Sequence, residues 1–354
     1  MHAMFIEASE KLGVDPETLA MMAISGFLNS PLVSGGTETQ TVQTMQRSQA
    51  SDSDDGNEHL HTSSMSNGKD YFVNVSSLRQ DESVFDGMRN SEINYSGVCR
   101  NSYDDFYDAE NILWGQFSRF LPIKVSLRGL AIMTEGGSPV TIDDWFTWVF
   151  ESAPYIRTYL RQVDKENRIP RGEQFASGFP KDLDKSLSRY VNHSCACEYK
   201  DGTVVGLPAH LGLIHIEGEG DFSNKLVSLT QAGLEYVSIS NSVIDEGSTS
   251  MAMSPEEATF MMSRIEDILP KAWGFLRFVL SSVGDGDNTP VELSAAITIV
   301  YGKGTTQNWN DKQVPTYRTG AIGLLGDMGL ISRTWKFRSV TYSVTDKGKE
   351  VLSQ

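Results

Sequence analysis

The chain has 354 residues, of which 39% are hydrophobic and 21% charged, so it is long enough for two or three globular domains. Its longest apolar runs are too short to span a bilayer, and three cysteines do not make a disulfide framework, so we expect a cytoplasmic protein without membrane contact. The net charge of −16 argues against a protein that coats nucleic acid non-specifically, because phosphate attraction is the main source of such binding.

The N-terminal part of the chain divides into three segments by composition. Residues 1–33 contain Asp15-Pro16-Glu17, a typical helix start, and are predicted to form a helical segment that docks on its own domain or on a partner. Residues 34–69 are rich in Ser, Thr, Gln, Gly, Asn and Asp and are predicted to be a flexible acidic and polar linker, because they cannot bury enough apolar surface to offset chain entropy. Residues 70–110 are a mixed connecting region.

The rest of the chain contains an internal repeat. Each copy has, in the same order, a Leu-Pro start, a Leu-Arg pair, a Pro-Val pair, a "GLI" element and a "T-x-x-G" turn. The matching segments are 120–122 and 268–270, 127–128 and 276–277, 139–140 and 290–291, 211–214 and 328–331, and 228–234 and 343–349. This order predicts two related domains, at 111–245 and 254–354. The first is longer, and we place much of its insertion at 164–179.

The second copy is predicted to be helical up to a terminal hairpin. Ser254-Pro255-Glu256-Glu257 is a capping box that begins a long helix, in which apolar residues recur at helical spacing as far as Val279. A polar turn leads to a second helix at about 291–301, and a third helix begins near Pro315. Apolar residues of the third helix are predicted to face the core, which leaves its N-terminal end exposed at Tyr317, Arg318 and Thr319.

The C-terminal segment shows the most specific pattern in the chain. A helix with an arginine near its start, at 316–319, is followed by "MGLI" at 328–331, a basic and aromatic hairpin at 332–338, and a strand that ends in "VTDKGKEVL". This order resembles the third helix and wing of the winged helix-turn-helix superfamily, over roughly the final third of the chain and, through the repeat, over the first copy. The resemblance implies a mainly α fold with small β-wings (α+β), built from tandem winged-helix domains behind the helical N-terminal segment.

The resemblance also implies a non-catalytic protein that binds double-stranded DNA, such as a regulator or a subunit of a DNA-handling complex. In helix-turn-helix docking the start of the third helix enters the major groove, where an arginine can donate to guanine. Residues 300–354 carry eight Lys/Arg against four Asp/Glu, so this end is locally basic. The implied DNA-binding residues are Thr316, Tyr317, Arg318 and Thr319 on the helix and Arg333, Trp335, Lys336 and Arg338 on the wing.

The first copy departs from this pattern. Pro208 lies where its third helix is expected, and the wing at 217–221 is acidic. We therefore expect the first copy to pack against the rest of the protein or to contact a partner.

Two other functions stay open. The first is a protein-interaction scaffold, in which both copies dock partner subunits or further copies of the chain. The second is a divergent magnesium-dependent nuclease centred on Asp182, Glu198 and Lys200, where the carboxylates would hold the metal and the lysine would polarise water. Lys181 interrupts the usual Pro-Asp order of that centre.

His193, Cys195 and Cys197, with Cys99 as a fourth ligand, raise the alternative of a zinc site. The H-x-C-x-C spacing is too cramped for a standard structural zinc site. The sequence contains no phosphate-binding loop, nucleophile elbow or zinc-protease pair. We therefore predict no catalytic residue, no metal and no cofactor.

Overall fold

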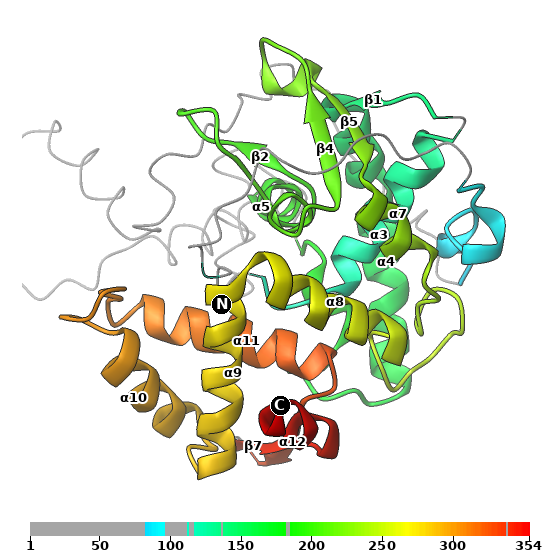
Figure 1. Cartoon of the computed structure of the whole chain (residues 1–354). Helices are drawn as coiled ribbons and strands as arrows, with labels where there is room; N and C mark the ends of the chain where they lie inside the picture. The colour runs from blue at the N-terminus through cyan, green and yellow to red at the C-terminus, as the bar shows by residue number, and fades with distance from the viewer. Residues whose placement is uncertain (1–81, 96–111, 113–116, 136, 182–184, 338) are drawn as a thin grey trace, which may run out of the picture. The chain divides into compact units, whose positions relative to one another are not determined.

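The structure is a computed structural model, and it describes residues 82–95, 112, 117–135, 137–181, 185–337 and 339–354. All of these belong to one compact unit, 57–354. The predicted N-terminal helical segment (1–33) and linker (34–69) lie outside the described residues. The described part is mainly helical with small antiparallel sheets (Figure 1), which confirms the predicted mainly α, α+β class.

The region of the first copy consists of helices around one small sheet and one two-stranded ribbon. Its helices are α3 (Leu121–Met133), α4 (Ile142–Glu166), η4 (Phe175–Gly178), α5 (Lys185–Ser194), α6 (Leu207–His210), η5 (Phe222–Asn224) and α7 (Gln231–Ser238), and the preceding connecting region contributes η2 (Glu82–Phe85) and η3 (Asn90–Glu92). Its strands are β1 (Val140–Thr141), β2 (Cys197–Glu198), β3 (Val204–Val205), β4 (Ile214–Glu217) and β5 (Leu226–Leu229). Strand β5 pairs antiparallel with both β1 and β4, and β2 pairs with β3.

The region of the second copy has five helices and one hairpin. The helices are α8 (Pro255–Ile268), α9 (Pro270–Asp285), α10 (Pro290–Tyr301), α11 (Gln313–Asp327) and α12 (Asp346–Ser353), and the hairpin strands are β6 (Ile331–Lys336) and β7 (Ser339–Val344). The hairpin is antiparallel, with Ile331 opposite Val344 and Lys336 opposite Ser339. The predicted second helix, third helix and terminal hairpin of this copy are confirmed.

The predicted long helix from 254 is wrong in one respect, because it is two helices. The capping box at Ser254 and Glu257 is present and begins α8. Leu269 then leaves the helical region, with φ −127° and ψ 59°, and Pro270 begins α9. A proline restricts the residue before it to non-helical conformations, which explains the break. The apolar spacing continues across it because both helices pack on the same core.

The strand-to-helix turn is the same in both copies. The turn is formed by a threonine, by the glycine three positions later and by the leucine of the preceding "GLI" element. These are Thr230, Gly233 and Leu213 in the first copy, and Thr345, Gly348 and Leu330 in the second. The threonine amide donates to the leucine carbonyl at 3.1 and 3.0 Å, and the threonine hydroxyl accepts from the glycine amide at 3.0 and 3.1 Å. A Cβ on the glycine would lie only 1.9 and 2.3 Å from the leucine carbonyl oxygen. Both turns therefore require glycine.

Helix α3 carries two fully buried cations, Lys124 and Arg128. The ammonium of Lys124 pairs with Glu257 of α8 at 2.9 Å, and both side chains are completely buried. The guanidinium of Arg128 donates through both terminal nitrogens to Asp245, each at 2.7 Å, and also to the carbonyl of Met88 at 2.9 Å. These bonds tie α3 to three segments that are distant in the sequence.

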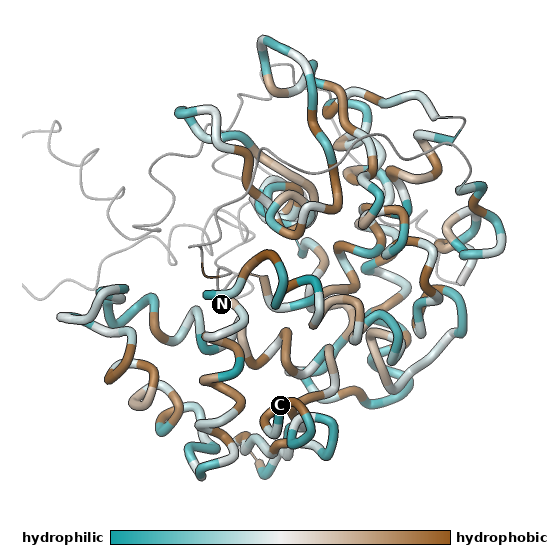
Figure 2. The backbone as a smooth tube through the Cα atoms, in the orientation of Figure 1, coloured by the Kyte–Doolittle hydropathy of each residue, from teal (hydrophilic) through white to brown (hydrophobic). Residues whose placement is uncertain are grey.

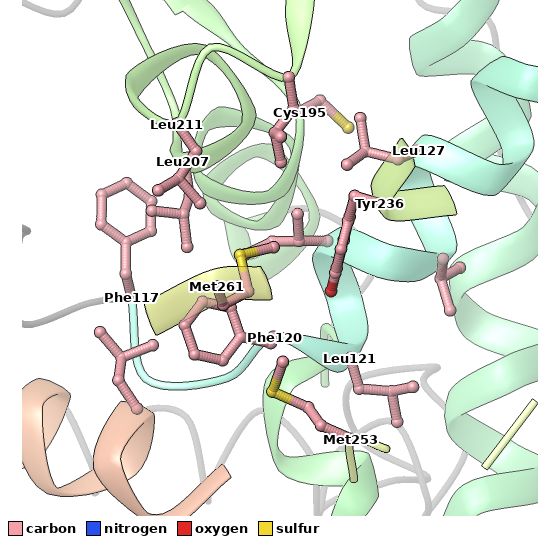
Figure 3. Close-up of a cluster of buried hydrophobic side chains, with 14 of the residues drawn as sticks. Phe117, Phe120, Leu121, Leu127, Cys195, Leu207, Leu211, Tyr236, Met253 and Met261 are labelled. Atoms are coloured by element: carbon pink, nitrogen blue, oxygen red, sulfur yellow. The ribbon is translucent and has the colours of Figure 1, made fainter. Parts of the chain in front are cut away.

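The hydrophobic core is continuous from the first copy into α8. Figure 3 shows Phe120 and Leu121 at the start of α3 close to Tyr236 of α7 and Met261 of α8, with Leu207 of α6 on the far side. Tyr236 and Met261 have no exposed surface. Helix α8, which begins the second copy in the sequence, is therefore built into the core beside the first.

Candidate recognition surface

The C-terminal half of α11 packs against residues of the first copy. A Cβ at Gly323 would lie 2.3 Å from the carbonyl oxygen of Ser118, so the backbones are in close contact there. The carboxylate of Asp327 accepts from the amide of Phe120 at 2.9 Å and from the guanidinium of Arg119 at 2.6 Å. This half of the helix that was predicted to enter the DNA groove therefore packs against the first copy.

Tyr317 is half-buried in an aromatic cluster, which corrects its predicted exposure. Its ring stacks on that of Trp309, with centroids 3.9 Å apart and planes at 4°. The rings of Phe275 and Tyr301 complete the cluster, and burial raises the pKa of Tyr317. Trp309 thus fixes the loop before α11 in place, because its ring packs on that of Tyr317 in the helix.

Arg318 is bound by α10, which also differs from the prediction. Its guanidinium donates to the carbonyl of Pro290 at 2.7 Å and to the hydroxyl of Ser294 at 2.6 Å. These bonds fix α10 against α11. A guanidinium already bound to two protein oxygens is not presented to a base edge as the sequence implied.

Arg333 is likewise held by protein oxygens. It donates to the carbonyl of Gly172 at 2.6 Å and to that of Ile322 at 2.8 Å. Burial and the nearby Arg119 lower the pKa of Arg333. Its predicted place as a phosphate contact on the outer wing is corrected, because the side chain joins the hairpin to the 164–179 segment.

The remaining predicted residues lie at or near the surface. Thr316 and Thr319 are exposed, and their hydroxyls bond to helix carbonyls at 3.0 and 2.7 Å. Lys336 is exposed, and Trp335 is 40% exposed although it lies against Gly172. Arg338 lies outside the described residues.

The tip of the hairpin has an unusual feature at Phe337. Its side chain is fully exposed, and its φ of 57° is in the left-handed region. A bulky residue rarely adopts that conformation, and an apolar side chain gains nothing from full exposure. This makes the tip a candidate contact, beside Lys336.

Helix α10 is rich in hydrophobic residues (Figure 2), and several of them are exposed. Val291 and Ile299 are each 79% exposed and Val300 is 46% exposed, whereas Leu293 and Ile297 on the opposite face are fully buried. Exposed Ala295 lies between Val291 and Ile299 on the outer face. A surface helix normally turns a polar face to solvent, so large aliphatic side chains exposed to this degree mark α10 as a candidate contact surface.

A cavity of about 480 Å³ lies where the two copies meet. Its walls include Arg119, Asp327 and Arg333, together with Met253 and Lys347. The first three are engaged in the hydrogen bonds between the copies described above. These three charged groups at the cavity therefore hold the two copies together.

The proposed nuclease and zinc residues do not gather into a described centre. Asp182 lies outside the described residues, and Glu198 pairs with Lys225. Burial raises the pKa of the Cys195 thiol, and that of Cys197 to about 12, so both favour the neutral thiol over the metal-binding thiolate. Among the residues that the structure describes, no three His, Cys, Asp or Glu side chains are placed to share a metal ion.

The described helices include none with the length and apolarity to cross a bilayer. Comparisons of the chain with models of protein families, with curated proteins and with solved structures found no match.

Proposed function

We propose that this protein is a non-catalytic recognition subunit that binds another protein surface through the outer face of α10. The observation that carries the proposal is the exposure of Val291 and Ile299, at 79% each, on a helix whose other face is fully buried. Leaving two large aliphatic side chains in water forgoes about 1.5 to 3 kcal/mol each. A contiguous apolar patch of this kind typically marks an interaction site.

We further propose that each copy is a winged-helix domain. In the second copy, helices α9, α10 and α11 precede the β6–β7 hairpin, and the amide of Tyr342 in β7 donates to the carbonyl of Asn288 just before α10 at 2.8 Å. In the first copy, β1 takes the equivalent position beside β5. This order and pairing support the assignment, and many domains of this layout bind proteins.

The hydrogen bonds that Arg318 and Arg333 make within the protein favour protein over DNA as the main target. Each guanidinium donates to two protein oxygens, so contact with phosphate or base would require these bonds to break. The net charge of −16 also opposes an approach to nucleic acid, except where a local basic patch faces it.

The test is capture of partners from the native host with the full chain as bait. The bait carrying Val291→Glu and Ile299→Glu should retain at least about tenfold less of the partner than the unchanged bait, because each substitution buries a charge in an apolar interface. Thr259→Glu, at an exposed position of α8, is the matched control and should retain the partner. An identical set of partners on all three baits would contradict the proposal.

DNA contact through the hairpin tip is the second candidate. The specific observation in its favour is that exposed Phe337 lies beside exposed Lys336, a pairing of apolar wedge and cation that suits a groove. The same preparations decide between the candidates in a mobility-shift assay at about 50 mM salt. DNA contact would be supported if the chain binds duplex DNA and Lys336→Ala weakens that binding. The dependence of the affinity on salt should then fall by about the amount expected for one phosphate contact.

A further inference from the structure

The outer face of α10 is symmetric about its centre. Val291, Ala295 and Ile299 are spaced four residues apart and therefore lie in one row along the helix. A small residue stands in the middle of the row, with a larger aliphatic residue on either side. If a second α10 lies antiparallel across this row, with the two-fold axis at Ala295, each Val291 meets the other copy's Ile299. The small side chain at the axis lets the two helices approach closely.

The charges on α10 permit such a pairing. The helix contains no Lys or Arg, and Glu292 is its single charged residue. The carboxylate of Glu292 is engaged at its own helix start, where it accepts from the amide and the hydroxyl of Thr289 at 3.1 and 2.8 Å. Exposed Glu292 is therefore the one charge that the helix itself brings to the contact, and a two-fold axis at Ala295 sets it opposite the uncharged Thr298 of the other copy rather than opposite a second carboxylate.

The residues just beyond the helix ends are complementary in an antiparallel pair. Asp287 precedes α10 and exposed Lys303 follows it, and each is eight positions from Ala295. An antiparallel pair therefore brings Asp287 of one copy and Lys303 of the other to the same end of the contact, and this holds at both ends. The antiparallel arrangement also sets the positive N-terminal end of each helix dipole beside the negative C-terminal end of the other.

We propose that two copies of this chain pair through α10 in an antiparallel, isologous contact centred on Ala295. This deepens the proposed function, since it rests on the same apolar face and names the partner as a second copy. The row on α10, the uncharged residue opposite Glu292 and the opposite charges just beyond the two helix ends make the surface complementary to itself.

The first test is sedimentation velocity of the full chain over a concentration range of about 1 to 100 µM. The unchanged chain should shift from monomer to dimer within this range. Ile299→Glu should raise the dissociation constant at least about 100-fold, because the symmetric contact buries the new carboxylate twice, each time against Val291 of the other copy. Thr259→Glu should leave the constant unchanged.

The second test uses charge reversal to fix the geometry. Asp287→Lys alone, or Lys303→Asp alone, sets like charges together at both ends and should weaken pairing about fivefold at low ionic strength. The chain with both substitutions should recover the original constant to within about twofold, since opposite charges then face each other again. Additive weakening in the double variant would exclude the antiparallel register.

The outcomes separate this inference from the proposed function. A chain that stays monomeric at about 100 µM overturns the pairing. If that monomer still captures a different protein, and Ile299→Glu abolishes the capture, recognition through α10 stands while the second copy is excluded as its target. If the chain neither dimerises nor captures another protein through α10, both proposals are wrong.

Discussion

Replacing Lys124 by methionine should lower the free energy of unfolding by about 3 to 5 kcal/mol, the usual cost of leaving one member of a buried ion pair alone. Methionine preserves the length and apolar contacts of the side chain but removes the ammonium. The carboxylate of Glu257, fully buried and 2.9 Å from that ammonium, would then lack its counter-charge. The carbonyls of Tyr236 and Ile239, bound at 2.5 and 2.7 Å, would lose a donor as well.

The pKa values of Lys124 and Glu257 are both shifted by their burial. Burial lowers the pKa of Lys124 to about 8, although the neighbouring Glu257 opposes this change. Burial raises the pKa of Glu257, and Lys124 opposes that change in turn. Each group therefore depends on the other to remain charged in the core. A single removal is costly for this reason, whereas neutralising both is mild.

Urea unfolding of a double variant provides the control. Glu257→Gln keeps an amide oxygen that can accept from the amide of Ser254, the bond that caps α8 at 2.9 Å. Adding Glu257→Gln to Lys124→Met should therefore recover about half of the lost stability or more. If the single variant unfolds at the same urea concentration as the unchanged chain, the ion pair contributes nothing and the packing of α3 on α8 must rest on apolar contacts.

Acidification from pH 7 to pH 5 should destabilise the fold through His193 by about 2 kcal/mol. Burial, and to a lesser extent Arg189, lowers the pKa of this histidine from 6.5 to about 4. Between these two values the unfolded chain binds more protons than the folded chain. The contribution of His193 to the free energy of unfolding therefore rises with pH across this window. It is fully present above pH 6.5 and is lost as the pH falls towards 4.

The check compares urea midpoints at the two pH values in two histidine variants. His193→Phe should flatten the pH dependence, because phenylalanine has no titratable group and can keep the edge-on contact with Phe117, whose ring centroid is 5.2 Å away. His215→Gln, at a side chain that is 21% exposed, should retain the full loss at pH 5. The assignment to His193 fails if the loss persists in His193→Phe.

Local patterns in the sequence predicted the local structures. The capping box at Ser254, the two "T-x-x-G" turns and the C-terminal hairpin depend on residues a few positions apart, and all three are present. The break at Pro270 was missed, because the apolar spacing continues across it and was interpreted as one long helix. The repeat was detectable for the same reason, since each matching turn requires a threonine and a glycine at fixed separation.

Long-range pairings were not predictable in this way. Nothing near Lys124 or Arg128 in the sequence indicates that they are buried, because their partners Glu257 and Asp245 lie more than a hundred positions away. Arg333 looked like a wing cation because its neighbours are polar, but its acceptor is the carbonyl of Gly172 in the other copy. Its role depends on how the two copies pack.

The apolar face of α10 did have a sequence signal. The stretch "PVELSAAITIVY" has aliphatic residues over most of the helix circumference, and Glu292 is its single charged residue. A helix at a domain surface is expected to have one polar face. The scarcity of charged residues, rather than any motif, is the sequence signal on which the proposed protein contact rests.

Thiol labelling at position 299 is the most direct test of that surface. With Cys99 replaced by serine, and with Cys195 and Cys197 buried, Ile299→Cys provides the reactive thiol, and Thr259→Cys is the exposed reference. At about 1 µM the two should react with a maleimide at similar rates, and at about 100 µM the thiol at 299 should slow at least about tenfold while the reference does not. Slow reaction at the lower concentration would show that the chain itself covers α10, and equal rates at both would show that no second copy does.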